Sequence, residues 1–321
     1  MAGASEAGRI VTLTLNPALD LASEAERVEP VHKIRTTGDH VDPGGGGINV
    51  ARVVHALGGE TLAVIASGGV TGRYIEALLE EAGVPCCAVP IAERTRISLT
   101  VLDRATGLDW RFVPQGPALT EAEWRAMLAA VEAEPGAWLV ASGSLPRGAP
   151  ADAYAEVARL AARRGMRFAL DSSGPALAAA MAQGVDLVKP SLRELESLAG
   201  RPLRAAGEPE AAARALIRAG SARMVAVTLG EGGALLATAG GVLRATAPPE
   251  RVHSAVGAGD SFLAAMVLTL ARGGTPAAAL AWAVAAGGAA VSGVGTARIE
   301  RADVERRVPL VAVSGPDNGE P

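Results

Sequence analysis

The chain has 321 residues, of which 49% are apolar, and a formal net charge of -4. This length and composition allow one large buried core with a small appendage. The weakly acidic balance excludes a general electrostatic attraction to nucleic acid or to an anionic membrane, so any bound anion must meet a local cluster of Arg or Lys.

The cysteine pattern and the N-terminal composition bear on the compartment. Cys86 and Cys87 are adjacent, which prevents an unstrained disulfide between them, and no Cys/His metal-binding spacing occurs. No apolar signal segment follows the first ten residues, and the stretch 276–293 is rich in Ala and Gly, as in a buried helix rather than a membrane span. We therefore expect a cytoplasmic protein with small-molecule partners and with neither nucleic acid nor membrane as partner.

Short apolar runs alternate with segments of helical periodicity. Strands are predicted at 10–15, 61–66, 138–143, 167–171, 185–189, 224–229 and 234–238. Helices are predicted between most of them, at 72–82, 121–132, 152–164 and 208–219. This alternation is typical of an α/β fold in three layers, α/β/α, with a mainly parallel central sheet covered by helices on both faces.

Two stretches break this alternation. Residues 20–42 and 95–113 carry strand-like sequence with no helix inside, and we interpret them as antiparallel strands of a small β-strand lid outside the main sheet. Two long apolar helices are expected between 256 and 294. The resulting prediction is a single domain over 9–310, with disordered tails at 1–8 and 314–321.

The segment AVGAGDSF at 255–262 precedes an apolar helical run. Gly257 and Gly259 flank Ala258 where a helix should begin, so free backbone N–H groups and the positive end of the helix dipole would face an anion. Asp260 would lie in the first turn, where its carboxylate could accept a proton from a hydroxyl beside a transferring phosphoryl group. Taken alone, the segment is explained more simply by Asp260 capping the helix.

The segment PGGGGIN at 43–49 leads directly into a periodic helix. Successive glycines indicate a backbone that approaches a ligand closely or takes positive φ values, the alternative being a flexible linker. Asn49 would project from this helix N-terminus toward the same space as Asp260. The sequence has no Walker A motif, and no G-x-G-x-x-G follows the first strand, which excludes a P-loop enzyme and an NAD-dependent dehydrogenase.

Six motifs occur together in one order. They are TLNPALD ending at Asp20, PGGGGINVAR at 43–52, SGSLP at 142–146, DSSG at 171–174, VTLGEGGAL at 227–235 and VGAGDS at 256–261. In order and approximate spacing, across residues 9–305, the chain resembles the ribokinase-like (PfkB) carbohydrate kinases. The resemblance implies a ribokinase-like fold, a homodimer whose lids pack together, and ATP-dependent phosphorylation of the C1 hydroxyl of fructose 6-phosphate to fructose 1,6-bisphosphate. It also implies Mg²⁺ and allows a monovalent cation such as K⁺.

The resemblance also implies roles for individual residues. Asp260 would be the catalytic base, and the amides of Gly257, Ala258 and Gly259 would stabilise the transferring group. Sugar hydroxyls would be bound by Asp20, Gly45, Gly46 and Asn49. The substrate phosphate and its surroundings are assigned by similarity to Lys33, Arg35, Arg96, Arg111 and Ser144, although an exposed Arg on a strand is usually only solvated.

On the nucleotide side, the resemblance assigns Lys189, Ser191, Thr228, Gly230 and Gly232 to ATP and Glu194 to the metal. The family pattern is Asn-x-x-Glu, and Ser191 stands in place of the Asn. Serine can still hold a metal-bound water, but its reach is shorter, so metal affinity is the expectation that this departure affects.

The glycine loop bears on the substrate. In relatives acting on fructose 1-phosphate or tagatose 6-phosphate the loop more often reads G-G-K-G, and Gly46 in place of that Lys favours fructose 6-phosphate. Two alternatives stay open: a kinase for one of those other ketose phosphates, and a catalytically inactive nucleotide- or sugar-binding regulator.

Overall fold

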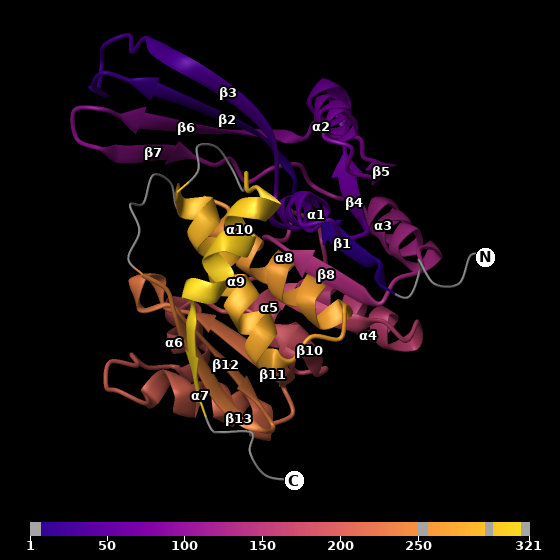
Figure 1. Ribbon diagram of the computed structural model, residues 1–321. Coiled ribbons are helices and arrows are strands. Elements are labelled where there is room, and N and C mark those ends of the chain that lie inside the picture. The colour runs from indigo at the N-terminus through magenta and orange to yellow at the C-terminus, as the bar shows by residue number, and fades with distance from the viewer. Residues whose placement is uncertain (1–7, 249–255, 293–297, 316–321) are drawn as a thin grey trace.

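The computed structural model describes residues 8–248, 256–292 and 298–315, in which a large sheet carries helices on both faces and a small second sheet lies at one end (Figure 1). The main sheet has ten strands, in the order β14 (Ala312–Ser314), β13 (Gly241–Thr246), β12 (Ala234–Thr238), β11 (Ala222–Thr228), β10 (Val185–Val188), β9 (Arg167–Asp171), β8 (Trp138–Ser142), β1 (Ile10–Thr14), β4 (Thr61–Ser67) and β5 (Cys86–Pro90). The pairs from β11 to β5 are parallel, and β12, β13 and β14 are added antiparallel.

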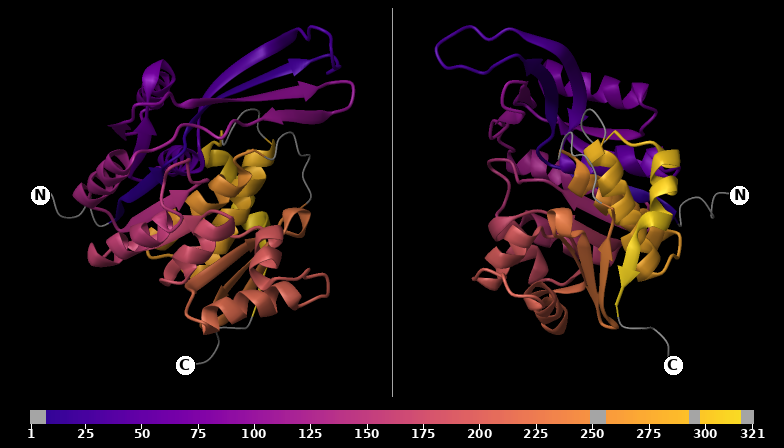
Figure 2. Two further views of the ribbon diagram at one scale, coloured as in Figure 1. Left: turned by 180° about the vertical axis from the view of Figure 1, so that it is seen from behind. Right: turned by 60° about the vertical axis from the view of Figure 1, so that its left-hand side comes forward.

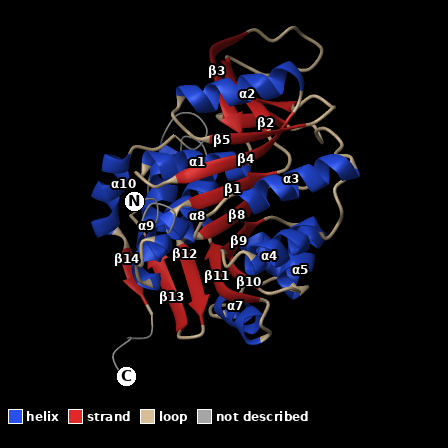
Figure 3. Ribbon diagram, turned by 90° about the vertical axis from the view of Figure 1, so that its right-hand side faces the viewer, coloured by secondary structure: helices blue, strands red, loops and turns tan. Residues whose placement is uncertain are grey.

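The three-layer arrangement is confirmed. One face is covered by α1 (Gly46–Ala56), α8 (Ala258–Ala271), α9 (Pro276–Ser292) and α10 (Arg301–Arg307), which share one apolar core. The other face is covered by α3 (Glu121–Ala133), α4 (Ala153–Arg163), α5 (Gly174–Met181), α6 (Leu192–Ala199) and α7 (Glu208–Arg218). α2 (Gly69–Glu81) packs with α1 against β4. Figure 3 shows the strands in succession between the helical layers.

Alternation along the central strands explains how one sheet serves two cores. In β8, Trp138 and Val140 pack toward α8 and α9, whereas Leu139 and Ala141 pack toward the opposite layer. Successive side chains of a strand point to opposite faces, so a fully apolar strand is the expected sequence for a sheet buried on both sides. All of these residues are at most 1% exposed.

The predicted elements are largely confirmed. Each of the seven predicted strands and four predicted helices is present within three residues of its expected bounds, as are α8 and α9. β5, β13 and β14 were not predicted, because β5 and β13 are only partly buried and β14 has three residues. α9 has 17 residues, and none of the helices in the described ranges is both long and apolar enough to cross a membrane.

The lid is also present, as a four-stranded sheet of β3 (Thr36–Gly44), β2 (Ala18–Ala25), β6 (Arg96–Asp103) and β7 (Leu108–Phe112), in that order (Figure 2). The expectation that its strands are antiparallel is wrong for one pair, because β2 and β6 run parallel. After β3 the chain passes through α1, β4, α2 and β5 before it returns, so β6 leaves the main fold in the same direction as β2.

The lid sheet has one polar face and one apolar face. Residues opposite one another across paired strands share a face, so Asp20, Ser98 and Asp42 lie on one face with Arg111. The other face carries apolar side chains, of which Trp110 is 46% exposed.

The C-terminal boundary differs from the expectation. β14 pairs with β13, so ordered chain continues beyond 310 and includes Ser314, which was expected to lie in a disordered tail. Pairing with an existing sheet edge supplies the hydrogen bonds that so short a strand could not obtain alone. The remaining tail residues, 1–7 and 316–321, lie outside the described residues.

Candidate active site

The predicted site residues gather at one edge of the main sheet. Parallel strands end at the same edge, and in α/β folds ligands bind beyond the carboxyl ends of such strands. Ser142 ends β8, Asp171 ends β9 and Thr228 ends β11, while Lys189 follows directly after β10. The N-terminus of α8 and the base of the lid meet this edge.

Asp260 lies in the first turn of α8, as predicted, three residues after the N-cap Gly257. Asn49 Nδ2 donates to Asp260 Oδ2 at 2.9 Å, and Ser142 Oγ donates to Asp260 Oδ1 at 3.2 Å. Burial and the nearby charge of Asp171 raise the pKa of Asp260 to about 7, against the lowering effect of both hydrogen bonds. A half-buried carboxylate with this pKa is suited to accept a proton near neutral pH.

The backbone before Asp260 is arranged to receive an anion. Gly257 has φ 79°, a left-handed conformation that a residue with a side chain rarely adopts. The first N–H groups of a helix have no acceptor within the helix, so those of Ala258 and Gly259 can donate to a bound group. A Cβ at Gly259 would lie 3.2 Å from Lys189 Nζ, so this glycine keeps the helix close to the buried ammonium.

The glycines at 44 and 46 lie directly against two polar side chains. A Cβ added at Gly44 would overlap Asp20 Oδ2, and one at Gly46 would overlap Ser142 Oγ. The close approach predicted for this loop is therefore present, but toward Asp20 and Ser142. Any side chain at position 46, including the Lys of the G-G-K-G pattern, would have to displace the Ser142 hydroxyl from its place beside Asp260.

Asp20, Arg96 and Arg111 are brought together at the base of the lid. Burial raises the pKa of Asp20 to about 6, opposed by a hydrogen bond from Ser98 and by the charges of Arg96 and Arg111. Arg96 donates to the carbonyl of Asn16 at 2.9 Å, and its Nε is buried with no partner among the described residues. This arrangement can receive an anion beside a carboxylate that is able to accept hydrogen bonds from hydroxyls.

Ser144 joins the same group through Asn16. Asn16 Nδ2 donates to Ser144 Oγ at 3.4 Å and to the carbonyl of Gln115 at 3.0 Å. Asn16 therefore contacts both Ser144 and Arg96, and links β8 to the lid.

Lys33 and Arg35 are not brought to this group. Both are exposed in the loop between β2 and β3, with neither hydrogen bond nor ion pair to a residue of the described ranges. Asp20 lies five residues before the end of β2, which at about 3.3 Å per residue puts the loop roughly 17 Å along the strand from Asp20. Within one chain these two cations lie away from the other predicted substrate residues.

Ser191, Glu194 and Thr228, which were predicted to hold the nucleotide and its metal, lie together. Ser191 pairs with Thr228 in an isolated parallel bridge. Ser191 Oγ accepts from the Glu194 N–H at 3.3 Å, and Glu194 Oε2 accepts from the Ser191 N–H at 2.8 Å. This capping box explains Ser191, since Ser and Asn are both favoured N-cap residues. Gly230 and Gly232 bound a single helical turn directly after β11.

Lys189 occupies a more buried position than a nucleotide contact requires. It is 5% exposed, and its Nζ lies 3.0 Å from Asp171 Oδ2. Burial disfavours the ammonium form, but the ion pair with Asp171 outweighs it and raises the pKa of Lys189. Lys189 is therefore a fixed positive charge beneath Gly259.

The residues fit a magnesium ion that is bound mainly through substrate. Mg²⁺ is usually held by one or two carboxylates together with waters and substrate phosphates. In the described part of the chain, no three His, Cys, Asp or Glu side chains form a metal-binding group. Glu194 Oε2 accepts both bonds from Ser191, which leaves Oε1 for a metal-bound water.

Sequence reasoning missed Ser142, Asp171, Ser98 and Asn16. Ser142 and Asp171 begin the motifs SGSLP and DSSG, so their positions were marked although their contacts were not. Asn16 is one of three asparagines in the chain, and this rarity was the available signal.

A buried cluster at the base of the lid was also missed. Asp42, 3% exposed on β3, accepts from Arg52 of α1 at 3.0 Å and from Arg298 at 3.1 Å. These contacts tie the lid to the helical layer. Arg52 ends the motif PGGGGINVAR, although no contact was predicted for it, and Arg298 lies in none of the quoted motifs.

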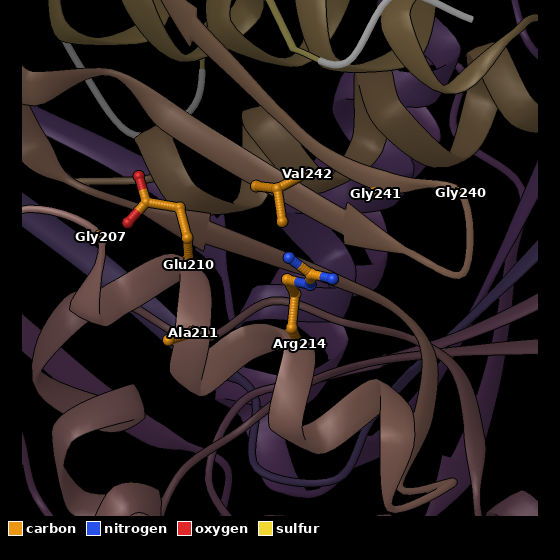
Figure 4. Close-up of a pocket in the computed structure, with 7 residues that line it drawn as sticks. All are labelled: Gly207, Glu210, Ala211, Arg214, Gly240, Gly241 and Val242. Atoms are coloured by element: carbon orange, nitrogen blue, oxygen red, sulfur yellow. The ribbon is translucent and has the colours of Figure 1, made fainter.

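A separate pocket of about 500 Å³ lies between α7 and the turn that joins β12 to β13 (Figure 4). It is lined by Gly207, Glu210, Ala211, Arg214, Gly240, Gly241 and Val242. None of the predicted site residues is among them.

Comparisons with known proteins identify the family of this chain. The pfkB family carbohydrate kinase model matches residues 14–302. ATP-dependent 6-phosphofructokinase isozyme 2 of Mycobacterium tuberculosis is 45% identical over 306 residues, covering 95% of this chain and 90% of that protein. 1-Phosphofructokinase of Rhodobacter capsulatus is 35% identical over 271 residues, covering 81% of this chain and 83% of that protein.

A solved structure shares nearly the whole fold. The crystal structure of phosphofructokinase-2 from Escherichia coli in complex with fructose-6-phosphate has a TM-score of 0.89 and 39% identity, covering 94% of this chain and 98% of that one. With the family match over most of its length, the chain belongs to the pfkB family of carbohydrate kinases.

Proposed function

We propose that this protein transfers the γ-phosphoryl group of ATP to the C1 hydroxyl of fructose 6-phosphate, giving fructose 1,6-bisphosphate and ADP. The observation that carries the proposal is the environment of Asp260. A carboxylate in a helix N-terminal turn, with a pKa of about 7, combines a proton acceptor with an anion-binding backbone. The names of the M. tuberculosis and E. coli relatives support the choice of acceptor.

The acceptor would lie between the lid and the glycine loop. Arg96 and Arg111, with Ser144, would bind the 6-phosphate, and Asp20 would bind sugar hydroxyls beside Gly45 and Gly46. Asn49 would contribute its Oδ1, which is buried without a partner among the described residues. The C1 hydroxyl would then lie beside Asp260, which takes its proton as the oxygen attacks the γ-phosphorus and the bond to the ADP oxygen breaks.

The donor would lie across the α8 N-terminus. The amides of Gly257, Ala258 and Gly259 would stabilise charge on the transferring group, with Lys189 adding a buried positive charge. Thr228, Gly230 and Gly232 would line the nucleotide, and Glu194 with Ser191 would hold waters of a bound Mg²⁺, which supplies charge neutralisation on the phosphates. We extend to this chain a monovalent-cation requirement, since one E. coli structure is named as a complex with potassium.

A homodimer through the lids would complete the site. The apolar lid face, made by Leu99, Trp110, Phe112 and Leu108, is exposed in the single chain, and a second copy would cover it. In the same dimer, Lys33 and Arg35 of one copy would lie close to the proposed substrate site of the other copy. An E. coli relative is named as a tetrameric inhibited form, which supports association in this family. Cys86 and Cys87 are both free thiols, in keeping with a cytoplasmic location.

The test is a coupled ADP-release assay with Mg-ATP against fructose 6-phosphate, fructose 1-phosphate, tagatose 6-phosphate and fructose. We expect a higher kcat/KM for fructose 6-phosphate than for the other three, lost in Asp260→Asn. Preference for another phosphate would replace the substrate and keep the mechanism, whereas ADP release from none of them would support a binding protein.

A further inference from the structure

The strand end at Ser142 carries a hydrogen-bond arrangement that the transfer mechanism above does not use. Gly143, the next residue, has φ 116°, a conformation that residues with side chains rarely adopt. Its N–H donates to the carbonyl of Asp171 at 3.0 Å. Its carbonyl accepts from Tyr154 Oη at 2.9 Å and from Ser172 Oγ at 3.0 Å. Gly143 is thus held on both sides of its Cα.

We propose that Tyr154 and Ser172 are positioning residues for the catalytic base, acting through the backbone of Gly143 to keep the Ser142 hydroxyl directed at Asp260 Oδ1. Neither side chain is hydrogen-bonded to Asp260 in the described structure. The inference rests on the proposed role of Asp260 and adds the residues that orient it.

The placement of Tyr154 suits this role. It belongs to α4, on the face of the sheet opposite α8, and its side chain is fully buried. Burial raises the pKa of its phenol further above the usual value, so the hydroxyl remains a donor throughout the working pH range. A buried phenol usually needs a hydrogen-bond partner, and here the Gly143 carbonyl is that partner.

The direction of the Ser142 hydroxyl is otherwise weakly determined. A serine side chain can rotate about χ1, and its oxygen packs against Gly46, which has no side chain to hold it. The position of Ser142 Cβ is set by the backbone at the end of β8, which the hydrogen bonds of Gly143 hold in place. Ser144, on the other side of Gly143, accepts a hydrogen bond from Asn16, which also contacts Arg96. Gly143 therefore lies between Ser142, which contacts Asp260, and Ser144, which lies near the proposed phosphate-binding residues.

Tyr154→Phe tests the proposal, because it removes one hydroxyl and keeps the ring. A neutral hydrogen bond contributes about a fivefold effect, so kcat should fall about fivefold with the KM values for both substrates nearly unchanged. Loss of the Ser142 donor should also move the acidic limb of the kcat–pH profile to higher pH. The Gly143 carbonyl keeps Ser172 as a donor, so the melting temperature should fall by only about 2–4 °C. The matched control is Tyr74→Phe, an exposed tyrosine of α2 and the only other tyrosine in the chain.

A double-mutant cycle separates positioning from a general structural effect. If Tyr154 acts through Ser142, then Tyr154→Phe should cause no further loss of kcat in a Ser142→Ala background. An unchanged kcat and pH profile in Tyr154→Phe, or an equal loss in both backgrounds, would overturn the proposal. These outcomes differ from failure of the proposed function, which would appear as an active Asp260→Asn variant.

Discussion

Asn49 Nδ2 lies 2.9 Å from Asp260 Oδ2, which joins two residues 211 positions apart in the chain. Asn49 is in the first turn of α1 and Asp260 is in the first turn of α8, so the N-terminal ends of two helices meet at this hydrogen bond. Both helix dipoles place positive potential there, as does Lys189 below. The two glycine-rich segments of the sequence therefore meet around one carboxylate, in a region whose positive potential suits an anion.

Replacing Asp260 by Asn should lower kcat by about 10²–10⁴-fold, because the proton acceptor is lost while the shape is kept. The Asn oxygen can accept from Asn49, and the Asn amide can donate to the Ser142 oxygen. The KM for ATP should change little. Steady-state kinetics measure both constants, and a variant with half the normal kcat would remove Asp260 from the mechanism.

The activity of the wild-type protein should fall on the acidic side of about pH 7. The pKa of Asp260 is about 7, so the carboxylate is progressively protonated below that pH and cannot accept the proton of the C1 hydroxyl. A kcat–pH profile with saturating substrates measures this limb. A limb below pH 5 would mean that Asp260 is not the group that titrates.

Asp260 should also lower the stability of the fold at high pH. Its pKa is raised from 3.8 in the unfolded chain to about 7 in the folded chain, so folding disfavours the charged form. The resulting loss in free energy of unfolding is absent below pH 3.8, grows as the pH rises, and is complete above about pH 7. Asp260→Asn should therefore be more stable than wild type at pH 8, with a smaller difference at pH 5.

Urea unfolding at the two pH values measures that stability difference. The control is Asp39→Asn, which makes the same substitution at an exposed position of β3. An equal gain for Asp260→Asn at pH 5 and pH 8 would contradict the assigned pKa.

Replacing Arg111 by Gln should raise the KM for fructose 6-phosphate about 10- to 100-fold and leave the KM for ATP unchanged. Arg111 is exposed on the polar face of the lid and lowers the pKa of Asp20, which places its charge beside the acceptor site. A hydrogen bond between charged groups contributes effects of this size. Arg104→Gln is the matched control, because Arg104 is a lid cation paired with Glu24. A rise in the KM for ATP alone would show that the lid cations are wrongly placed.

Adding a single methyl group at Gly46 should lower kcat about tenfold or more. The new Cβ of Gly46→Ala would overlap Ser142 Oγ, so this hydroxyl would have to rotate away from Asp260. Gly240→Ala provides the comparison, since a Cβ there would lie 3.6 Å from its nearest neighbour. Kinetics of both variants, with melting temperatures to check folding, decide the matter. Full activity of Gly46→Ala would show that the Ser142 contact is dispensable.

Placing a charge on the apolar lid face should dissociate the proposed dimer. Trp110→Glu would introduce a carboxylate into a surface that a second copy would bury. Removing this charge from water costs free energy of association, whereas a charge at a position that stays exposed does not. Sedimentation velocity measures the change. Val70→Glu, at an exposed apolar position on α2, should leave the assembly intact. A wild-type monomer, or a Trp110→Glu variant of unchanged size, would contradict association through the lid.

Most of the architecture could be read from local patterns. Fully apolar runs such as 138–142 belong to strands buried on both faces, and the helices between them show a regular periodicity. The glycines at 257 and 259 marked the start of α8 with Asp260 in its first turn. Parallel pairing of β2 with β6 could not be read, because it depends on where the chain returns after β5.

The candidate site divides in the same way. Asp260, Asn49 and the glycines were found in the sequence because their chemistry requires particular residue types next to backbone turns, and Asp20 was assigned through the family resemblance of its motif. Ser142, Tyr154 and Asp42 were not, since a serine, a tyrosine or an aspartate has no local signal that tells a catalytic neighbour from a core residue. Lys33 and Arg35 carry suitable charge in the sequence, but within one chain the structure places them at the far end of the hairpin, away from the other predicted substrate residues.

The sequence by itself determined the class of fold, the family and the chemistry-bearing segments, because apolar periodicity and backbone-dependent residues act over a few positions. The tertiary structure alone decided which of these segments meet. It placed Ser142 beside Asp260, turned Lys189 into a buried ion pair and gave the lid one polar and one apolar face. Hydrogen bonds and pKa values depend on distance and burial, and both arise only when residues far apart in the chain pack together.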